Sequence, residues 1–137
     1  MMNNYSIKHC IAFPLGGKAL YTERIDDMTV KELIDQLELK ILVEDDLDRE
    51  VDDCYIGDLL SWVMGRAPGD SAWLTVMGNI NSIAVATLAD VSCIILVENA
   101  ALDDNARQKA EMHGVNILTT EDNAYQLAVK ISKLLEG

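Results

Sequence analysis

Three short apolar runs, separated by segments with helical spacing, constrain the fold of this chain more than any other feature of its sequence. The runs are AWLTVM at residues 72–77, CIILV at 93–97 and VNIL at 115–118. None shows the strict apolar–polar alternation of a half-exposed strand, so we expect each to be a strand buried on both faces. Such strands, joined by helices, form a largely parallel sheet. We therefore predict the α/β class, as a three-layer sandwich with a largely parallel central sheet, and periodicity leaves the strand order open.

The segments around these runs have the start and stop signals of helices. Thr29-Val30-Lys31-Glu32 is a capping box, which predicts a helix over about 29–38, and Gly114 stands where a C-terminal cap glycine belongs. Further helices are predicted from 57–65, from Asn79 to about 88, from 103–113 and over the last residues of the chain. Two more strands are expected at 40–43 and 47–56, the second with a solvated acidic side.

Size and charge limit the function classes. At 137 residues the chain is long enough to bury a core, and its net charge of -12 opposes binding to nucleic acid or to anionic membranes. No apolar run reaches the length of a membrane helix, and the N-terminus lacks the pattern of a signal peptide. Three scattered cysteines without a C-x-x-C pair are typical of a reducing compartment, so we expect a cytoplasmic protein.

Residues 1–27 differ in pattern from residues 28–137, and we divide the chain there into an N-terminal extension and one domain. The extension is compatible with a β-hairpin around Pro14-Leu15-Gly16-Gly17. It is equally compatible with a segment laid over the domain, or with a stretch that precedes a natural start at Met28.

The acidic stretch KILVEDDLDRE at residues 40–50 suggests the metal-binding strand of a phosphorelay receiver domain. The receiver reading fails because a predicted helix precedes the strand. A phospho-accepting aspartate would be needed near 86–90, where a helix is predicted, and no lysine-bearing strand follows VNILTT. A calcium loop fails because Val51 and Gly57 occupy positions that need glycine and glutamate. The acidic run is therefore interpreted as a solvated face that protects a sheet edge.

Catalytic signatures are also missing from the sequence. AFPLGGKAL at residues 12–20 is not a P-loop, since Ala12 and Ala19 replace the first glycine and the hydroxyl residue of that motif. No Cys/His metal cluster or nucleophile–base motif is present, and there are only two histidines. We expect no enzyme activity, no metal and no cofactor.

Three stretches carry a family resemblance: LDREVDDCYIGDLLSWVMGRA at 47–67, AWLTVMGNINSIAVATLADVSCIILVE at 72–98 and GVNILTTEDNAYQLAVKI at 114–131. Together they resemble the DRTGG-domain family over about residues 28–135, most specifically through GDLLSWVMGRA. Asp48 and Arg49 match the start of the namesake motif, but its glycine pair is absent.

The resemblance implies a regulatory module like those in some phosphotransacetylases and CBS-type pyrophosphatases, and a fold similar to the N-terminal, non-kinase domain of HPr kinase/phosphorylase. Small stand-alone members resemble accessory proteins, so it also implies a protein partner in redox/hydrogenase or acetate metabolism.

Small polar side chains follow the predicted strands, where open parallel sheets bind their ligands beside helix N-termini. The candidate ligand-binding residues are Asp58, Ser61, Thr75, Asn79, Asn81 and Thr120. These groups suit hydrogen bonding to a nucleotide or a similar metabolite. Asp58, Asn79 and Thr120 are also ordinary helix-capping choices, so a purely structural role is the alternative.

Trp62 and Arg66, four residues apart on one predicted helix, are candidates for a homodimer interface, with a surface cation–π pair or partial burial as the alternative. The sequence thus predicts a non-enzymatic regulatory domain that binds an adenine nucleotide or related metabolite and signals through a dimer or partner. The alternative is a protein-interaction or scaffolding module without a small-molecule ligand.

Overall fold

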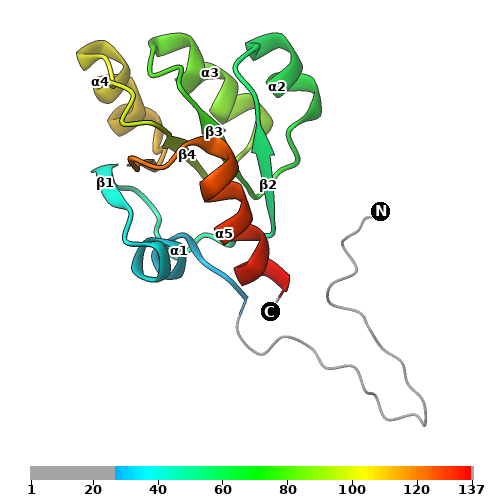
Figure 1. Ribbon diagram of the computed structural model, residues 1–137. Coiled ribbons are helices and arrows are strands. Elements are labelled where there is room, and N and C mark those ends of the chain that lie inside the picture. The colour runs from blue at the N-terminus through cyan, green and yellow to red at the C-terminus, as the bar shows by residue number, and fades with distance from the viewer. Residues whose placement is uncertain (1–26, 137) are drawn as a thin grey trace, which may run out of the picture.

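The computed structural model describes residues 27–136, which form five helices and five strands (Figure 1). In chain order these are α1 (Val30–Leu37), β1 (Lys40–Val43), β2 (Asp53–Ile56), α2 (Leu60–Arg66), β3 (Ser71–Thr75), α3 (Ile80–Ala89), β4 (Cys93–Leu96), α4 (Asp104–His113), β5 (Ile117–Thr119) and α5 (Ala124–Glu136).

All five strands belong to one sheet with the order β1-β5-β4-β3-β2. β2, β3, β4 and β5 run parallel to one another, whereas β1 pairs antiparallel with β5 at one edge. The predicted α/β class with a largely parallel sheet is therefore confirmed, and the sheet is mixed because of β1. β1 contains a register irregularity between Ile41 and Val43, and there Arg107 of α4 donates a hydrogen bond to the carbonyl of Leu42 (2.6 Å).

Alternate residues of the strands enter two separate hydrophobic clusters, as the two-residue period of a strand requires. Trp73, Ile94 and Ile117 pack with residues of α2, α3 and α4. Leu74, Ile95 and Leu118 pack with residues of α1 and α5. In Figure 1 the helices α2, α3 and α4 stand side by side, and α5 crosses in front of the strands. Burial of these apolar side chains is the main stabilising term of the fold.

Local signals set several helix ends as the sequence predicts. The Thr29 hydroxyl accepts a hydrogen bond from Glu32 N (3.2 Å) and the Glu32 carboxylate accepts one from Thr29 N (3.0 Å), so the capping box at α1 is complete. Gly114 ends α4 with φ 70°, a left-handed conformation that costs glycine little. Both predictions are confirmed.

The predicted strand over 47–56 is wrong in its first half, because β2 begins only at Asp53. Residues 44–52 instead form a loop, which is anchored to the start of α1 by backbone hydrogen bonds from Val30 N to Arg49 O (2.9 Å) and from Val51 N to Met28 O (2.8 Å). Asp46 accepts a hydrogen bond from Asp48 N (3.0 Å), a local turn that competes with strand pairing.

The expectations for residues 1–26, including the hairpin, lie outside the described residues. Within the described part of the chain, no helix combines the length and the apolar character needed to cross a bilayer.

Candidate functional site

The carboxyl ends of β2 and β3 bring two of the predicted ligand-binding residues into direct contact. The Thr75 hydroxyl donates a hydrogen bond to Asp58 Oδ1 (2.7 Å), and the same oxygen accepts one from Val76 N (3.0 Å). Asp58 therefore braces the turn after β3, and the N-cap of α2 is Leu59, without a side-chain cap. The capping alternative is wrong for Asp58, because its carboxylate turns toward β3 instead of the first N–H groups of α2.

Asn79, by contrast, caps α3, since its side-chain oxygen accepts a hydrogen bond from Ser82 N (3.1 Å). The capping interpretation is confirmed for Asn79. Thr120 lies in the β5–α5 loop, where its hydroxyl oxygen accepts a hydrogen bond from Asp122 N (3.2 Å), so it does not cap α5. Ser61 and Asn81 are exposed and make no hydrogen bond to the other four candidates.

The loops at this edge also lie tightly against each other. Asp103 N donates a hydrogen bond to the carbonyl of Gly78 (2.8 Å), and a Cβ at Gly78 would overlap the carbonyl oxygen of Ala101. Asn99 N donates to the carbonyl of Thr120 (2.8 Å). The polar groups of Asp58, Thr75 and Asn79 thus have partners within the chain, and the exposed Ser61 and Asn81 are the predicted residues left to meet a ligand.

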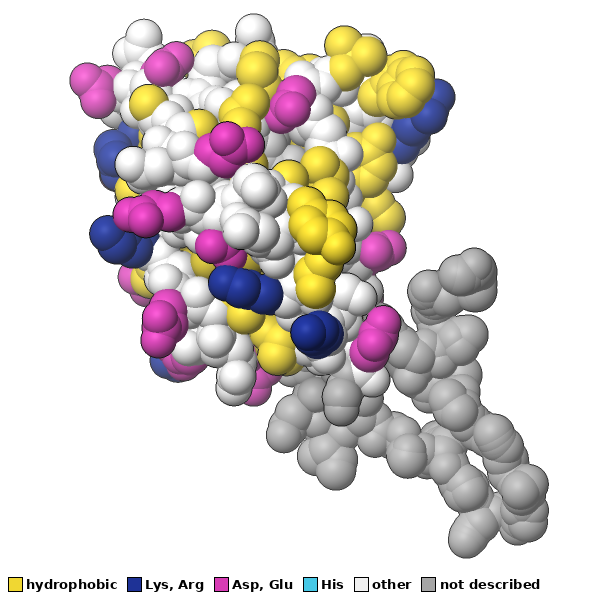
Figure 2. Space-filling view, in the orientation of Figure 1, with side chains coloured by type: hydrophobic (Ala, Val, Ile, Leu, Met, Phe, Trp, Pro, Cys, Tyr) yellow, Lys and Arg dark blue, Asp and Glu magenta, His cyan; other side chains and the backbone are white. Residues whose placement is uncertain are grey.

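Trp62 and Arg66 form a surface cation–π pair on α2, with Arg66 Cζ 3.8 Å from the centre of the Trp62 ring. Leu59 is the N-cap residue of α2 and stands three positions before Trp62, a spacing that brings residues to the same side of a helix. Leu59 and Trp62 remain 58% and 52% exposed, whereas Val63 of the same helix is fully buried. We call Leu59, Trp62 and Arg66 the α2 surface. Figure 2 shows hydrophobic side chains gathered beside a basic one in the upper right, where Figure 1 places α2.

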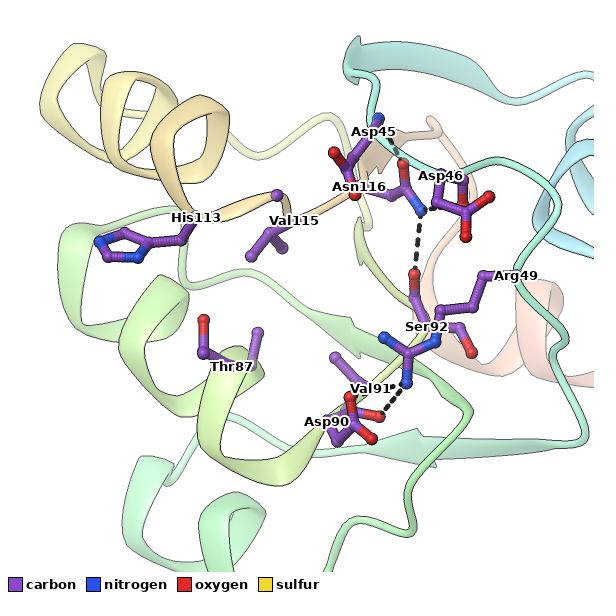
Figure 3. A pocket seen from close by; sticks show the side chains of 12 residues that line it. Asp45, Asp46, Arg49, Thr87, Asp90, Val91, Ser92, His113, Val115 and Asn116 are labelled. Atoms are coloured by element: carbon purple, nitrogen blue, oxygen red, sulfur yellow. Dashed lines mark hydrogen bonds and ion pairs between the residues drawn. The ribbon is translucent and has the colours of Figure 1, made fainter.

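A cavity of about 180 Å³ lies at the opposite, amino-terminal edge of the parallel strands (Figure 3). It is bordered by the loop after β1, by the C-terminal ends of α3 and α4, and by the residues just before β4 and β5. The lining residues are Asp45, Asp46, Arg49, Ala86, Thr87, Asp90, Val91, Ser92, His113, Gly114, Val115 and Asn116. Figure 3 shows the imidazole of His113 pointing away from the other polar side chains.

Arg49 connects two turns at this edge. Its guanidinium donates hydrogen bonds to Asp70 Oδ1 (3.0 Å), to Asp90 Oδ1 (2.9 Å) and to the carbonyl of Asp90 (2.6 Å). Asp70 and Asp90 are both left-handed, with φ 60° and 58°, a conformation that costs a non-glycine residue roughly 1–2 kcal/mol. Burial alone would lower the pKa of Arg49, but its hydrogen bonds and charge interactions with both aspartates raise it above the ordinary value.

Asn116 holds the other side of the cavity. Its amide nitrogen donates hydrogen bonds to the carbonyls of Asp46 (2.8 Å) and Ser92 (3.2 Å), and its oxygen accepts one from Asp45 N (2.7 Å). The Ser92 hydroxyl donates to the carbonyl of Glu50. Asn116 is only 3% exposed, and its three hydrogen bonds tie the loop after β1 to the start of β4. This satisfies the rule that buried polar groups are hydrogen-bonded.

Sequence reasoning did not find this cavity, because it placed the ligand site at the carboxyl edge alone. Two signals were present: Arg49 stands in the matched start of the family motif, and Asn116 is a polar residue inside the apolar run VNIL. Neither signal could show that Asp90, 41 residues after Arg49, completes the same site.

The described cysteines and acidic side chains do not form a reactive thiol or a metal-binding cluster. Burial raises the pKa of Cys54 and of Cys93 to about 12, so neither thiol is activated at neutral pH. Over residues 27–136, no three His, Cys, Asp or Glu side chains converge to hold a metal ion.

The described residues thus form a mixed α/β sheet with polar groups at both edges. The chain belongs to the DRTGG domain family, whose model matches residues 32–134. No curated protein sequence matches it significantly.

Among solved structures, the fold is similar to the CBS and DRTGG domains of the regulatory region of Clostridium perfringens pyrophosphatase, complexed with its activator diadenosine tetraphosphate. The similarity has a TM-score of 0.61 at 10% sequence identity, and covers 80% of this chain and 46% of that chain. This chain therefore spans less than half the length of that solved chain.

Proposed function

We propose that this protein is a non-enzymatic regulatory domain of the cytoplasm that acts by associating, through the α2 surface, with a second copy of itself or with a protein partner. The observation that carries the proposal is the exposure of Leu59 and Trp62 on α2, next to the edge strand β2. Exposed Trp and Arg side chains are enriched at protein interfaces, and apolar side chains clustered at a surface favour association. Membership of a regulatory domain family supports the same role.

The fold in this proposal is a three-layer sandwich, with α1 and α5 on one face of the sheet and the other helices on the opposite face. Support comes from the two hydrophobic clusters, which draw on alternate residues of the same strands. A rigid sheet of this kind would keep the α2 surface in a fixed relation to both edges.

The homodimer can be tested by sedimentation velocity over a range of protein concentrations. Leu59→Ser should weaken the dimer at least tenfold, because it places a hydroxyl where an apolar contact would form. Leu88→Ser is the matched control, since Leu88 is 70% exposed on α3 and lies outside the α2 surface. A wild-type chain that stays monomeric at high micromolar concentration would reject the homodimer, and equal weakening by both changes would reject the α2 surface as its interface.

An adenine nucleotide is the second part of the proposal, bound at the carboxyl edge near Ser61, Asn79 and Asn81. Two observations favour it. The pyrophosphatase regulatory region with a related fold is complexed with diadenosine tetraphosphate. The N-terminus of α3 at Asn79 also supplies the partial positive charge that attracts phosphates. The internal hydrogen bonds of Asp58 and Thr75 favour the alternative, an interaction module without a small-molecule ligand.

Thermal unfolding with diadenosine tetraphosphate, ATP, AMP and NAD(H), each with and without Mg²⁺, separates these alternatives. A ligand at 100 times its Kd should stabilise the domain by about 2.7 kcal/mol. Asn81→Ala should remove that shift, and because Asn81 is exposed and does not cap a helix, the variant should keep its unliganded stability. A panel without any shift would reject nucleotide sensing and leave the interaction module.

A further inference from the structure

We propose that the cavity at the amino-terminal edge of the sheet binds an organic cation, through an ammonium or guanidinium head group. This goes beyond the proposed function, which places nucleotide and partner at the carboxyl edge and on the α2 surface. The cavity is formed by three separate stretches of the chain, residues 45–49, 86–92 and 113–116, and some of its lining residues are themselves buried, including Ser92 and Asn116.

The lining charges favour a cation. Asp90 is paired with Arg49, which also pairs with Asp70, so Asp45 and Asp46 are the lining carboxylates without an ion-pair partner among the described residues. The other lining residue with an ionisable side chain, His113, points its imidazole away from them (Figure 3). Among the described residues, no side chain or backbone N–H donates a hydrogen bond to the carboxylate of Asp45. That carboxylate lies close against Gly114, where an added Cβ would be 3.1 Å from Asp45 Oδ2, closer than an ordinary van der Waals contact.

Two helix ends add to the negative electrostatic potential of the lining carboxylates. α3 ends at Ala89 and α4 at His113, and both C-terminal ends border the cavity. A helix C-terminus carries about half a negative charge on its last carbonyl groups, so two of them reinforce the carboxylates. The same field opposes a phosphate group, which separates this cavity from the nucleotide proposed at the other edge.

The volume of the cavity and the arrangement of its oxygen atoms limit the class of cation that it can bind. A cavity of about 180 Å³ is smaller than the roughly 300–1,000 Å³ of a drug-sized ligand site, so it suits a head group with a few methylenes. A bare metal ion is disfavoured, because no three potential metal-binding side chains of the described residues converge. Ammonium and guanidinium groups instead donate several N–H bonds to separate oxygen atoms, and the carboxylates of Asp45 and Asp46 supply such acceptors here.

The test uses agmatine, which carries both head groups, titrated into the full chain at low ionic strength and followed by amide chemical shifts in NMR spectra. We expect saturable shifts at the amides of Thr87, Gly114 and Asn116. Asp45→Asn should weaken binding about fivefold, as expected for loss of one partly exposed ion pair. Glu121→Gln is the matched control, because it removes one exposed charge from the loop after β5 at the opposite edge and should leave binding unchanged.

Thr87→Tyr places a larger side chain in the cavity without a change of charge, so it should weaken agmatine binding. Leu88→Tyr is its control, because Leu88 lies outside the lining and the change should leave binding as it is. A blocked Gly-Arg-Gly peptide identifies the source of the head group: tighter binding than agmatine assigns it to a partner's side chain, and weaker binding assigns it to a free amine. Absence of saturable shifts with both probes overturns the proposal. Equal losses for Asp45→Asn and Glu121→Gln also overturn it, since they would reveal attraction to the net charge of -12 alone.

Discussion

Removing the Arg49 side chain should destabilise the domain far more than removing an ordinary surface cation. Arg49→Ala eliminates the ion pairs with Asp70 and Asp90 and the hydrogen bond to the carbonyl of Asp90. The side chain of Arg49 is only 27% exposed, but those of Asp70 and Asp90 are 48% and 75% exposed, so each ion pair contributes at most about 1 kcal/mol.

The carbonyl of Asp90 also accepts a hydrogen bond from Asp70 N (3.0 Å), so it keeps one partner when the guanidinium is lost. The lost charged hydrogen bond therefore adds about 1 kcal/mol, below the usual range of about 1.5–3 kcal/mol for such bonds. With about 0.5 kcal/mol for each of the two ion pairs, the sum is about 2 kcal/mol, which corresponds to a fall in Tm of roughly 6–12 °C for a domain of this size. Arg49→Lys should lower the free energy of unfolding by about half as much. A lysine ammonium group lacks the planar fork of the guanidinium and cannot bridge both aspartates in the same way.

Urea unfolding followed by far-ultraviolet circular dichroism measures these differences. Lys31→Ala is the control, since Lys31 pairs with Asp35 at 3.6 Å on the surface of α1, and both side chains are more than 60% exposed. Its loss should cost no more than about 0.5 kcal/mol. The reasoning is refuted if the free energies of unfolding of Arg49→Ala and Lys31→Ala differ by less than about 0.5 kcal/mol, which is about the size of the control's own effect.

Three further predictions concern backbone packing and titration. Gly78→Ala should cost about 1–3 kcal/mol or prevent folding, since backbone atoms fill the Cβ position, whereas Gly65→Ala in α2 has open space and should stabilise by about 0.5–1 kcal/mol in the same urea assay. Cys54 and Cys93, with pKa values of about 12, should be alkylated by iodoacetamide at pH 8 about a thousandfold more slowly in folded than in unfolded protein, as measured by peptide mass spectrometry; equal rates would refute their burial. A side-chain hydrogen bond with Asp27, together with the negative charge of Asp27, raises the pKa of Glu50. The folded state therefore binds this proton more tightly than the unfolded state does. Stability should therefore gain from this group as pH falls from neutral toward 4.5, and Glu50→Gln should reduce that gain in thermal unfolding scans.

The physical reason for this last sign is that a carboxyl group with a raised pKa in the folded state costs stability when it is ionised. The cost is present above the raised pKa and disappears below the pKa of the unfolded chain. An unchanged slope of stability against pH in Glu50→Gln would contradict the assignment.

Local sequence signals predicted the parts of the fold that depend on neighbouring residues. The buried strands β3 and β4 were predicted within two residues at each end, because an apolar run without alternation demands burial on both faces. The capping box at Thr29 and the glycine at 114 placed the start of α1 and the end of α4, since both act within one helical turn. The α/β class and the family resemblance also followed from the sequence.

Tertiary structure decided what depends on residues far apart in the chain. The antiparallel pairing of β1 with β5 joins residues more than 70 positions apart, and no local pattern specifies it. Asp58 had the sequence position of a helix cap, yet its carboxylate bonds to Thr75, because folding places the end of β3 beside it. Residues 47–52 were predicted as the first half of a strand, but they belong to a loop in which Arg49 pairs with Asp70 and Asp90 of two other turns. Sequence thus determined the elements through short-range sterics and burial, whereas the sheet order and both polar edges arose from long-range packing and charge pairing.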